Sequence, residues 1–139
     1  MIVLDTSGLL ALIDADQHRH EEVKHSFEAD PGPFLLSPFV AAEVDYLLLD
    51  RVGPAAELLF LGEVARGAYR LEGFGADDVE QAAEVIGRYR DLRIGLAEAS
   101  LVVLAARAGT NRLLTLDERH FRAVRPLRGR AFTLLPADA

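Results

Sequence analysis

Hydrophobic and polar residues follow one another in blocks that predict strands and helices in turn. Short apolar runs are typical of buried strands, and longer amphipathic stretches are typical of helices. The predicted strands are Ile2–Leu4, Phe34–Leu36, Tyr69–Leu71, Arg112–Thr115 and, at one edge, Phe132–Leu135. The predicted helices span residues 6–15, 18–29, 38–51, 54–66, 76–90 and 96–108. Strands that alternate with helices favour an α/β fold with a parallel sheet covered on both faces.

Proline and glycine support these boundaries. Pro31, Gly32 and Pro33 separate the second helix from the second strand. Ser37 and Pro38 then form a typical helix start, with a capping hydroxyl followed by proline at the first helical position. No repeat, low-complexity tract or linker interrupts the pattern, so we expect one domain over residues 1–139.

The composition is that of a soluble globular protein. Half of the 139 residues are hydrophobic, and this length is sufficient for a substantial core. Because the chain has no cysteine, it has no disulfides or thiolate chemistry, which fits a reducing cytoplasm. No apolar run approaches the roughly 20 residues that span a bilayer. The N-terminus has no basic region of the kind that begins a signal peptide, so we expect a cytoplasmic protein without a membrane segment.

Charge is divided unevenly along the chain. Residues 1–87 carry five Lys or Arg against 17 Asp or Glu, whereas residues 88–139 carry ten Arg against five acids. The net charges of the two parts are −12 and +5, within a total of −7. Arginine offers a planar fork that suits phosphate, so the basic C-terminal part suggests a nucleic-acid surface. A solvated arginine-rich face is the alternative interpretation.

Four acidic residues lie in or beside apolar segments that otherwise resemble core. They are Asp5, Glu43, Glu98 and Asp117. A carboxylate removed from water is costly unless it is paired or binds a metal, and few basic residues are near them in sequence. Asp5 and Asp117 also directly follow predicted strands, where ligands bind in open parallel sheets. The pattern predicts one shared site for divalent cations.

Each acid also has a simpler interpretation. Asp5 could cap the first helix, and Glu98 could lie in the first turn of a helix because the helix dipole favours an anion there. Asp117 could belong to a turn after its strand. Glu43 could lie at a helix end exposed to solvent, and Asp45 has similar apolar helical neighbours, so the sequence does not separate these two acids.

Other chemistry finds little support. The chain has no HExxH motif, P-loop, GxGxxG or GxSxG. His18, His20 and His25 are expected at the surface, whereas His120, close to Asp117 and several arginines, is a candidate phosphate contact. The Thr115 hydroxyl could orient Asp117 through a hydrogen bond.

Four segments of this sequence together resemble the PIN-domain ribonucleases, and most closely the VapC toxins of bacterial toxin–antitoxin pairs. They are VLDTSGLLAL, SPFVAAEVDYLL, IGLAEASLVVLAARAGTNRLLTLDERHF and the following RAVRP. The resemblance covers essentially the whole chain. It implies a three-layer α/β/α sandwich with a central sheet of four to five mainly parallel strands. It also implies Mg²⁺- or Mn²⁺-dependent hydrolysis of structured RNA such as tRNA or rRNA, a homodimer, and a small cognate antitoxin.

The resemblance assigns catalytic and metal-binding roles to the four acids. Asp5, Glu43 and Asp117 match the first, second and fourth acids of the family. At the third position the family usually has Asp, and here Glu98 keeps the charge with one extra methylene. This difference concerns metal geometry and catalytic rate, not the fold.

Supporting residues also follow from the resemblance. Thr6 or Ser7 matches the polar residue after the first acid, and Thr115 lies two positions before the fourth. A positive rim for RNA could be supplied by the C-terminal arginines. These are Arg112, Arg119, Arg122, Arg125 and Arg128.

Two other functions can be weighed against a nuclease. An aspartyl phosphotransferase could use Asp5 as nucleophile, but the second Asp of dehalogenase-like phosphatases is replaced by Ser7. The late lysine of receiver domains is missing, because Lys24 is the single lysine. Alternatively, a PIN-fold module with weak or no catalysis could bind RNA or a protein partner, because Glu98 disturbs the site. Metal-dependent cleavage of structured RNA would separate this module from a working enzyme.

Overall fold

The computed structural model describes all residues from 1 to 139. The strands are β1 (Ile2–Leu4), β2 (Phe34–Leu36), β3 (Arg70–Leu71), β4 (Arg112–Leu114) and β5 (Thr133–Leu135). The helices are α1 (Thr6–Ile13), α2 (His20–Glu28), α3 (Pro38–Arg51), α4 (Pro54–Ala65), α5 (Ala76–Arg88), α6 (Leu96–Ala108), α7 (Glu118–Ala123) and the short 3-10 helix η1 (Arg90–Leu92).

The five strands form one fully parallel sheet in the order β3-β2-β1-β4-β5. The chain moves from β1 outward through β2 to β3, and then returns across the sheet to β4 on the other side of β1. The strand order therefore reverses between β1 and β4, which pair directly, with Val3 opposite Leu113 and Leu4 opposite Leu114. Such a reversal is where open α/β sheets bind ligands, beyond the carboxyl ends of the strands.

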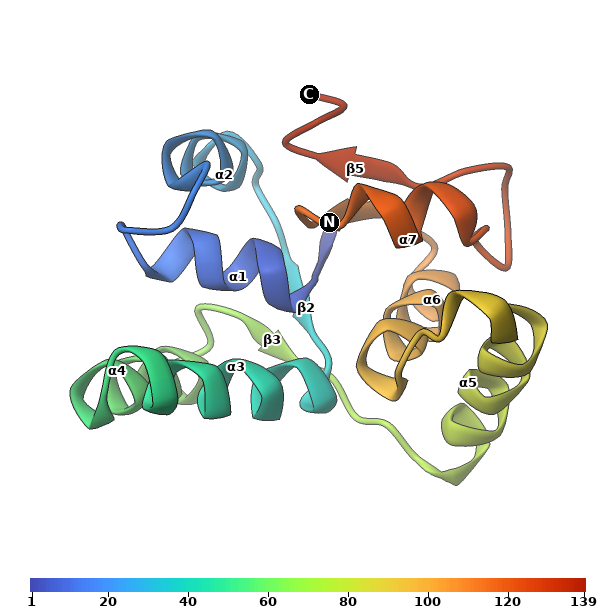
Figure 1. Cartoon of the computed structure of the whole chain (residues 1–139), viewed down its shortest axis with the longest axis horizontal. Helices are drawn as coiled ribbons and strands as arrows, with labels where there is room; N and C mark the ends of the chain where they lie inside the picture. The colour runs from blue at the N-terminus through green and yellow to red at the C-terminus, as the bar shows by residue number, and fades with distance from the viewer.

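Helices cover both faces of the sheet. In Figure 1, α1 to α4 lie on one side of the strands, and α5, α6 and α7 lie on the other. Within the layers α1 packs on α2, α3 on α4, and α5 on α6. The α/β fold with three layers and a parallel sheet, expected from the sequence, is confirmed, and the uncertain fifth strand is present.

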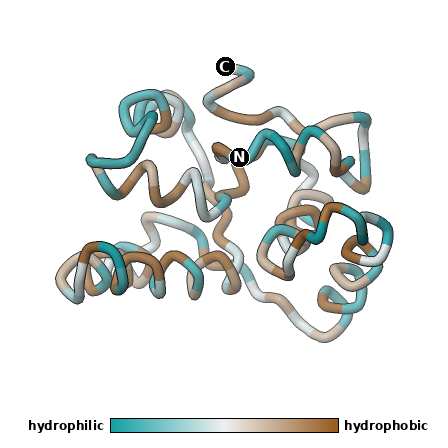
Figure 2. The backbone as a smooth tube through the Cα atoms, viewed as in Figure 1, coloured by the Kyte–Doolittle hydropathy of each residue, from teal (hydrophilic) through white to brown (hydrophobic).

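The core is built mainly from the strands and α6. All three residues of β1 are fully buried, as are both leucines of β2 and of β4. Seven consecutive residues of α6, from Ala99 to Ala105, are buried as well. Figure 2 shows the corresponding contrast between hydrophobic β1 and mostly hydrophilic α2. None of the helices combines the length and apolar character that crossing a membrane requires.

One helix was missed in the sequence, and several boundaries differ from the prediction. Residues 118–123, to which the sequence assigns no helix, form α7, whose Phe121 is buried against Phe132 with ring centroids 6.1 Å apart. Six residues are too few to show helical periodicity, so tertiary packing decides this element. The first helix ends at Ile13 rather than Ala15, the second begins at His20, and the predicted helix 76–90 divides into α5 and η1.

Gly8 allows α1 to cross β4 closely. A Cβ atom at this position would lie 2.3 Å from the backbone oxygen of Leu114. No side chain fits there without moving backbone. This close approach brings the first turn of α1 against the end of β4, where Thr115 and Asp117 follow.

Candidate metal centre and active site

Asp5 follows β1 and is almost completely buried, with 5% of its surface exposed. Its Oδ2 accepts hydrogen bonds from the hydroxyls of Thr115 (2.6 Å) and Ser7 (3.0 Å). Asp5 occupies the N-cap position of α1, but its side chain makes no capping hydrogen bond to the helix. The carboxylate is instead held in place by hydroxyls at the mouth of the sheet.

Burial raises the pKa of Asp5 to about 6. The hydroxyls of Thr115 and Ser7 act in the opposite direction because they stabilise the ionised form, and the negative charge of Asp117 adds a further rise. Without a nearby cation, this carboxylate is therefore destabilised as an anion. A bound divalent cation would relieve that cost.

Thr115 and Ser7 connect the end of β1 to the end of β4. Thr115 is buried, and its Oγ1 accepts a hydrogen bond from the backbone N–H of Asp117 (2.9 Å) while its hydroxyl donates to Asp5. Ser7 Oγ accepts from the Leu116 N–H (2.9 Å). Thr115 thus orients the backbone that carries Asp117, rather than its carboxylate. Thr6, the other predicted supporting residue, is buried with no hydrogen-bond partner for its hydroxyl.

Glu98, Asp117 and His120 form a compact cluster of possible metal ligands, one atom from each lying within 4.8 Å of the others. His120 Nδ1 is 2.9 Å from Asp117 Oδ2 and 3.4 Å from Glu98 Oε1. All three side chains are about a quarter exposed. Asp117 also caps α7, because its Oδ1 accepts from the His120 N–H (3.1 Å).

Glu98 has a structural contact as well as an open oxygen. Its Oε2 accepts from the backbone N–H of Gly95 (2.8 Å), three residues earlier, while Oε1 faces His120. This is the reach-back bond that an acid at the third helical position makes to the start of a helix. Asp78 makes the same bond to Gly75 in α5 (3.0 Å), so the shorter Asp also suffices for capping.

Glu43 stands apart from this cluster. It lies on α3, which packs against α1 and α6, and the buried Ser37 and Ser100 hydroxyls join α3 to α6 at 2.7 Å. The Glu43 side chain is exposed and makes no hydrogen bond or ion pair. The structure separates it from Asp45, whose carboxylate lies close to Glu57 of α4 and raises the pKa of that glutamate.

The predicted arginine rim is only partly available. Arg112 begins β4, at the opposite end of the strand from Asp117, and it forms an ion pair with the buried Asp30. Arg122 binds Asp138 with two hydrogen bonds (2.6 and 2.8 Å), and this pairing holds the pKa of Asp138 at about 2. Arg112 is therefore paired and lies away from the site acids, and the charge of Arg122 is already matched.

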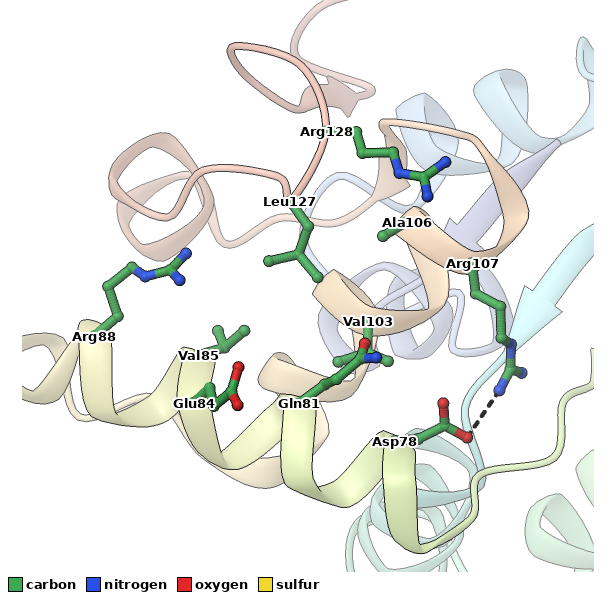
Figure 3. A pocket seen from close by; sticks show the side chains of 10 residues that line it. All are labelled: Asp78, Gln81, Glu84, Val85, Arg88, Val103, Ala106, Arg107, Leu127 and Arg128. Atoms are coloured by element: carbon green, nitrogen blue, oxygen red, sulfur yellow. Dashed lines mark hydrogen bonds and ion pairs between the residues drawn. The ribbon is translucent and has the colours of Figure 1, made fainter.

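Arg119 and Arg125 remain exposed and without an ion pair, and Arg119 lies in α7 beside the acidic cluster. Arg128 points toward a cavity of about 440 Å³ between α5, α6 and the loop with Leu127 (Figure 3). This cavity contains the ion pair of Arg107 with Asp78 (3.0 Å). None of the four predicted site acids lines it, so it is separate from the candidate metal centre.

The sequence interpretation missed the role of His120 in this cluster. The sequence suggests a phosphate contact for His120, but its Nδ1 lies against two carboxylates. The signal was its position three residues after Asp117, which becomes a shared helix face only once α7 is known. Gly8 was also missed, although a glycine inside a predicted helix often marks a close packing contact.

A doubly covered parallel sheet with Asp5 and Asp117 at its switch point is the architecture of a PIN-like α/β protein, and the comparisons with known proteins agree. The sequence matches the family model of the PIN domain over residues 2–126. The chain therefore belongs to the PIN-domain family.

Relatives within the family are close. The chain is 47% identical over 135 residues to ribonuclease VapC26 of Mycobacterium tuberculosis (strain ATCC 25618 / H37Rv), covering 97% of this chain and 100% of that protein. Its structure is similar to the crystal structure of Mycobacterium tuberculosis VapC20, described as a sarcin-ricin loop cleaving toxin. The TM-score is 0.83 at 26% identity, over 94% of this chain and 99% of that one. The fold also resembles a chain of a toxin–antitoxin complex from Klebsiella pneumoniae, with a TM-score of 0.67 at 19% identity and coverage of 89% and 92%.

Proposed function

We propose that this protein is a metal-dependent endoribonuclease that hydrolyses phosphodiester bonds in structured RNA and acts as the toxin of a toxin–antitoxin pair. The observation that carries the proposal is the buried Asp5, which is held by two hydroxyls and lies beside the Asp117 charge at the switch point of the sheet. The 47% identity to a VapC ribonuclease supports the same reaction class.

The residues present fit a divalent cation such as Mg²⁺ or Mn²⁺. The donors are carboxylates, which suit these hard ions, and the buried Asp5 carboxylate and the unpartnered Thr6 hydroxyl both lack a cationic neighbour. Asp5, Glu98 and Asp117 would hold the ion, and Glu43 on α3 is the fourth acid of the proposed site. When bound, the ion activates water as a nucleophile and stabilises the negative charge that develops on the phosphate.

The protein contributes positioning and charge. Thr115 and Ser7 keep one Asp5 oxygen fixed, which leaves the other oxygen free to act as a ligand. The capping bonds of Glu98 and Asp117 restrict their rotamers and direct one oxygen of each toward His120. Arg119 and Arg125, both exposed and unpaired, would contact RNA phosphates at the rim.

A catalytically weak PIN-fold module is the second candidate function, because the Glu98 carboxylate is longer than the usual Asp and half committed to its helix cap. A cleavage assay separates the two. Purified protein is incubated with a structured RNA, with Mn²⁺ or Mg²⁺ or with chelator, beside an Asp5→Asn variant. Metal-dependent cleavage that the variant lacks supports the enzyme. RNA binding without any cleavage supports the module.

Protein partners are part of the proposal. The helices α3 and α4 and the short link between them expose several large hydrophobic side chains, and the tube along these helices includes brown, hydrophobic stretches in Figure 2. These side chains are Tyr46, Leu49, Val52, Leu58, Leu59 and Leu61. An apolar surface of this kind is typical of a protein interface, and it supports both the homodimer and the antitoxin. Light scattering of the purified protein, alone and co-expressed with the product of a neighbouring short reading frame, tests both partners.

A further inference from the structure

We propose that His120 is a nitrogen ligand of the divalent cation, together with Glu98 and Asp117, and that it biases the site toward Mn²⁺ over Mg²⁺. This inference rests on the proposed function, which requires a cation at these acids. It goes further because it adds a nitrogen ligand to the carboxylate oxygens and predicts a preference for Mn²⁺ over Mg²⁺.

The spacing of the three side chains fits a shared ion. Ligands about 2.1 Å from a cation and at right angles to each other lie roughly 3.0 Å apart, and wider angles give somewhat longer separations. The distances from His120 Nδ1 are 2.9 Å to Asp117 Oδ2 and 3.4 Å to Glu98 Oε1. These are the separations of neighbouring ligands in one coordination sphere. None of the other histidines has a ring nitrogen beside two carboxylates.

The local structure holds His120 in this position. His120 lies in the first turn of α7, and its own backbone N–H is bonded to the Asp117 carboxylate that its ring also contacts. The helix is in turn anchored by the buried Phe121. The ring is 23% exposed, so the cluster is open to an ion from solvent.

The chemistry of the donor predicts the preference. Mg²⁺ takes oxygen ligands and keeps several waters, whereas the first-row transition metals accept imidazole more readily, Mn²⁺ the most weakly of the series. An Asp–Glu–His set therefore gains more with Mn²⁺ than with Mg²⁺. The competing role is that of a positioning residue, in which Nδ1–H donates to Asp117 and the imidazole never contacts the ion.

The experiment compares the whole protein with His120→Gln and, as a matched control, with His18→Ala at an exposed histidine. Glutamine retains an N–H donor and a hard carbonyl oxygen but removes the imidazole nitrogen. Pulsed electron paramagnetic resonance of bound Mn²⁺ reports directly on a coordinated imidazole nitrogen. Calorimetric titrations give the affinities for Mn²⁺ and Mg²⁺, and melting curves verify folding.

We expect a directly bound nitrogen in the parent and in His18→Ala, and its loss in His120→Gln. Affinity for Mn²⁺ should fall by roughly tenfold or more in His120→Gln, while affinity for Mg²⁺ changes by less than about twofold because the amide oxygen serves Mg²⁺. Bound Mn²⁺ without a nitrogen signal in the parent would make His120 a positioning residue and overturn the inference, leaving the proposed function intact. A parent that binds neither ion would overturn both. An unfolded His120→Gln leaves the parent's nitrogen signal to decide.

Discussion

Replacing Asp5 by Asn should stabilise the protein in the absence of cations while abolishing its proposed activity. The Asp5 carboxyl is buried, and its pKa is raised from 3.8 to about 6. The folded protein therefore binds the proton more tightly than the unfolded chain does. As pH rises from about 4 to above 6, the unfolded chain releases this proton first, and the free energy of unfolding falls.

The size of the effect follows from the same shift. At about 1.4 kcal/mol per pH unit, ionised Asp5 lowers the free energy of unfolding by about 3 kcal/mol at pH 7. Asn is neutral, and its oxygen still accepts a hydrogen bond from Thr115 or Ser7. One of the two hydroxyl bonds is lost, at about 1 kcal/mol. The expected net gain is about 2 kcal/mol, which corresponds to a rise in melting temperature of roughly 4–8 °C.

Urea unfolding in chelator at several pH values between 4 and 7.5 measures this difference directly. Asp16→Asn is the matched control, because Asp16 is exposed and its carboxylate makes no contact. The advantage of Asp5→Asn over the parent should appear as pH rises through about 4 to 6 and then remain constant. Saturating Mn²⁺ should stabilise the parent, by about 2.7 kcal/mol at a hundred times the dissociation constant, and the variant much less. A difference between the two proteins that does not depend on pH would refute the assigned burial cost.

Three further predictions test other parts of the site and fold. Glu98→Asp should keep the fold, since Asp78 shows that Asp can cap in the same way, and its metal-dependent cleavage should match or exceed that of the parent. Glu98→Gln should lower cleavage on the order of tenfold or more, because the charged ligand is lost. Equal cleavage by Glu98→Gln and the parent in one Mn²⁺ titration would exclude Glu98 as a ligand. Replacing Arg119 and Arg125 together by Ala should reduce the slope of log affinity for single-stranded RNA against log salt by about 1.4, or 0.7 per phosphate contact. Arg112→Ala, at the paired arginine, should leave the salt slope unaltered. An unchanged slope in the double variant would show that Arg119 and Arg125 are solvent-exposed residues that do not contact RNA phosphates. Gly8→Ala should lower the free energy of unfolding in urea by about 1–3 kcal/mol, because its Cβ would meet the Leu114 carbonyl at 2.3 Å; a stability equal to the parent's would show that α1 and β4 are not in such close contact.

The sequence was sufficient to predict most of the architecture. Apolar runs such as Ile2–Leu4 and the amphipathic stretches between them are local signals, because burial on both faces of a parallel sheet leaves an uninterrupted apolar strand. The position of Asp5 and Asp117 after their strands followed from the same pattern, since parallel strands end at a common edge. The resemblance to PIN-domain ribonucleases, now supported by the family match, came from motifs that lie in these segments.

Tertiary structure alone decided which charges serve the site. Arg112 and Arg122 belong to a basic segment of the sequence, but the fold pairs them with Asp30 and Asp138, residues that lie 82 and 16 positions away. No local pattern reports such pairings. Composition can therefore predict a basic segment, but not how many of its charges remain free.

His120 shows the same limit in the site itself. The sequence determined the order of strands and helices, because hydrophobic periodicity is local and the right-handed crossover restricts how the elements connect. The sequence did not determine that α7 forms, that Gly8 allows α1 to pack closely on β4, or that the His120 side chain lies against Glu98. Each of these features depends on contacts between residues distant in the chain. Close packing of those contacts leaves few arrangements available, and so the tertiary structure, rather than local propensity, sets which side chains face one another at the candidate metal centre.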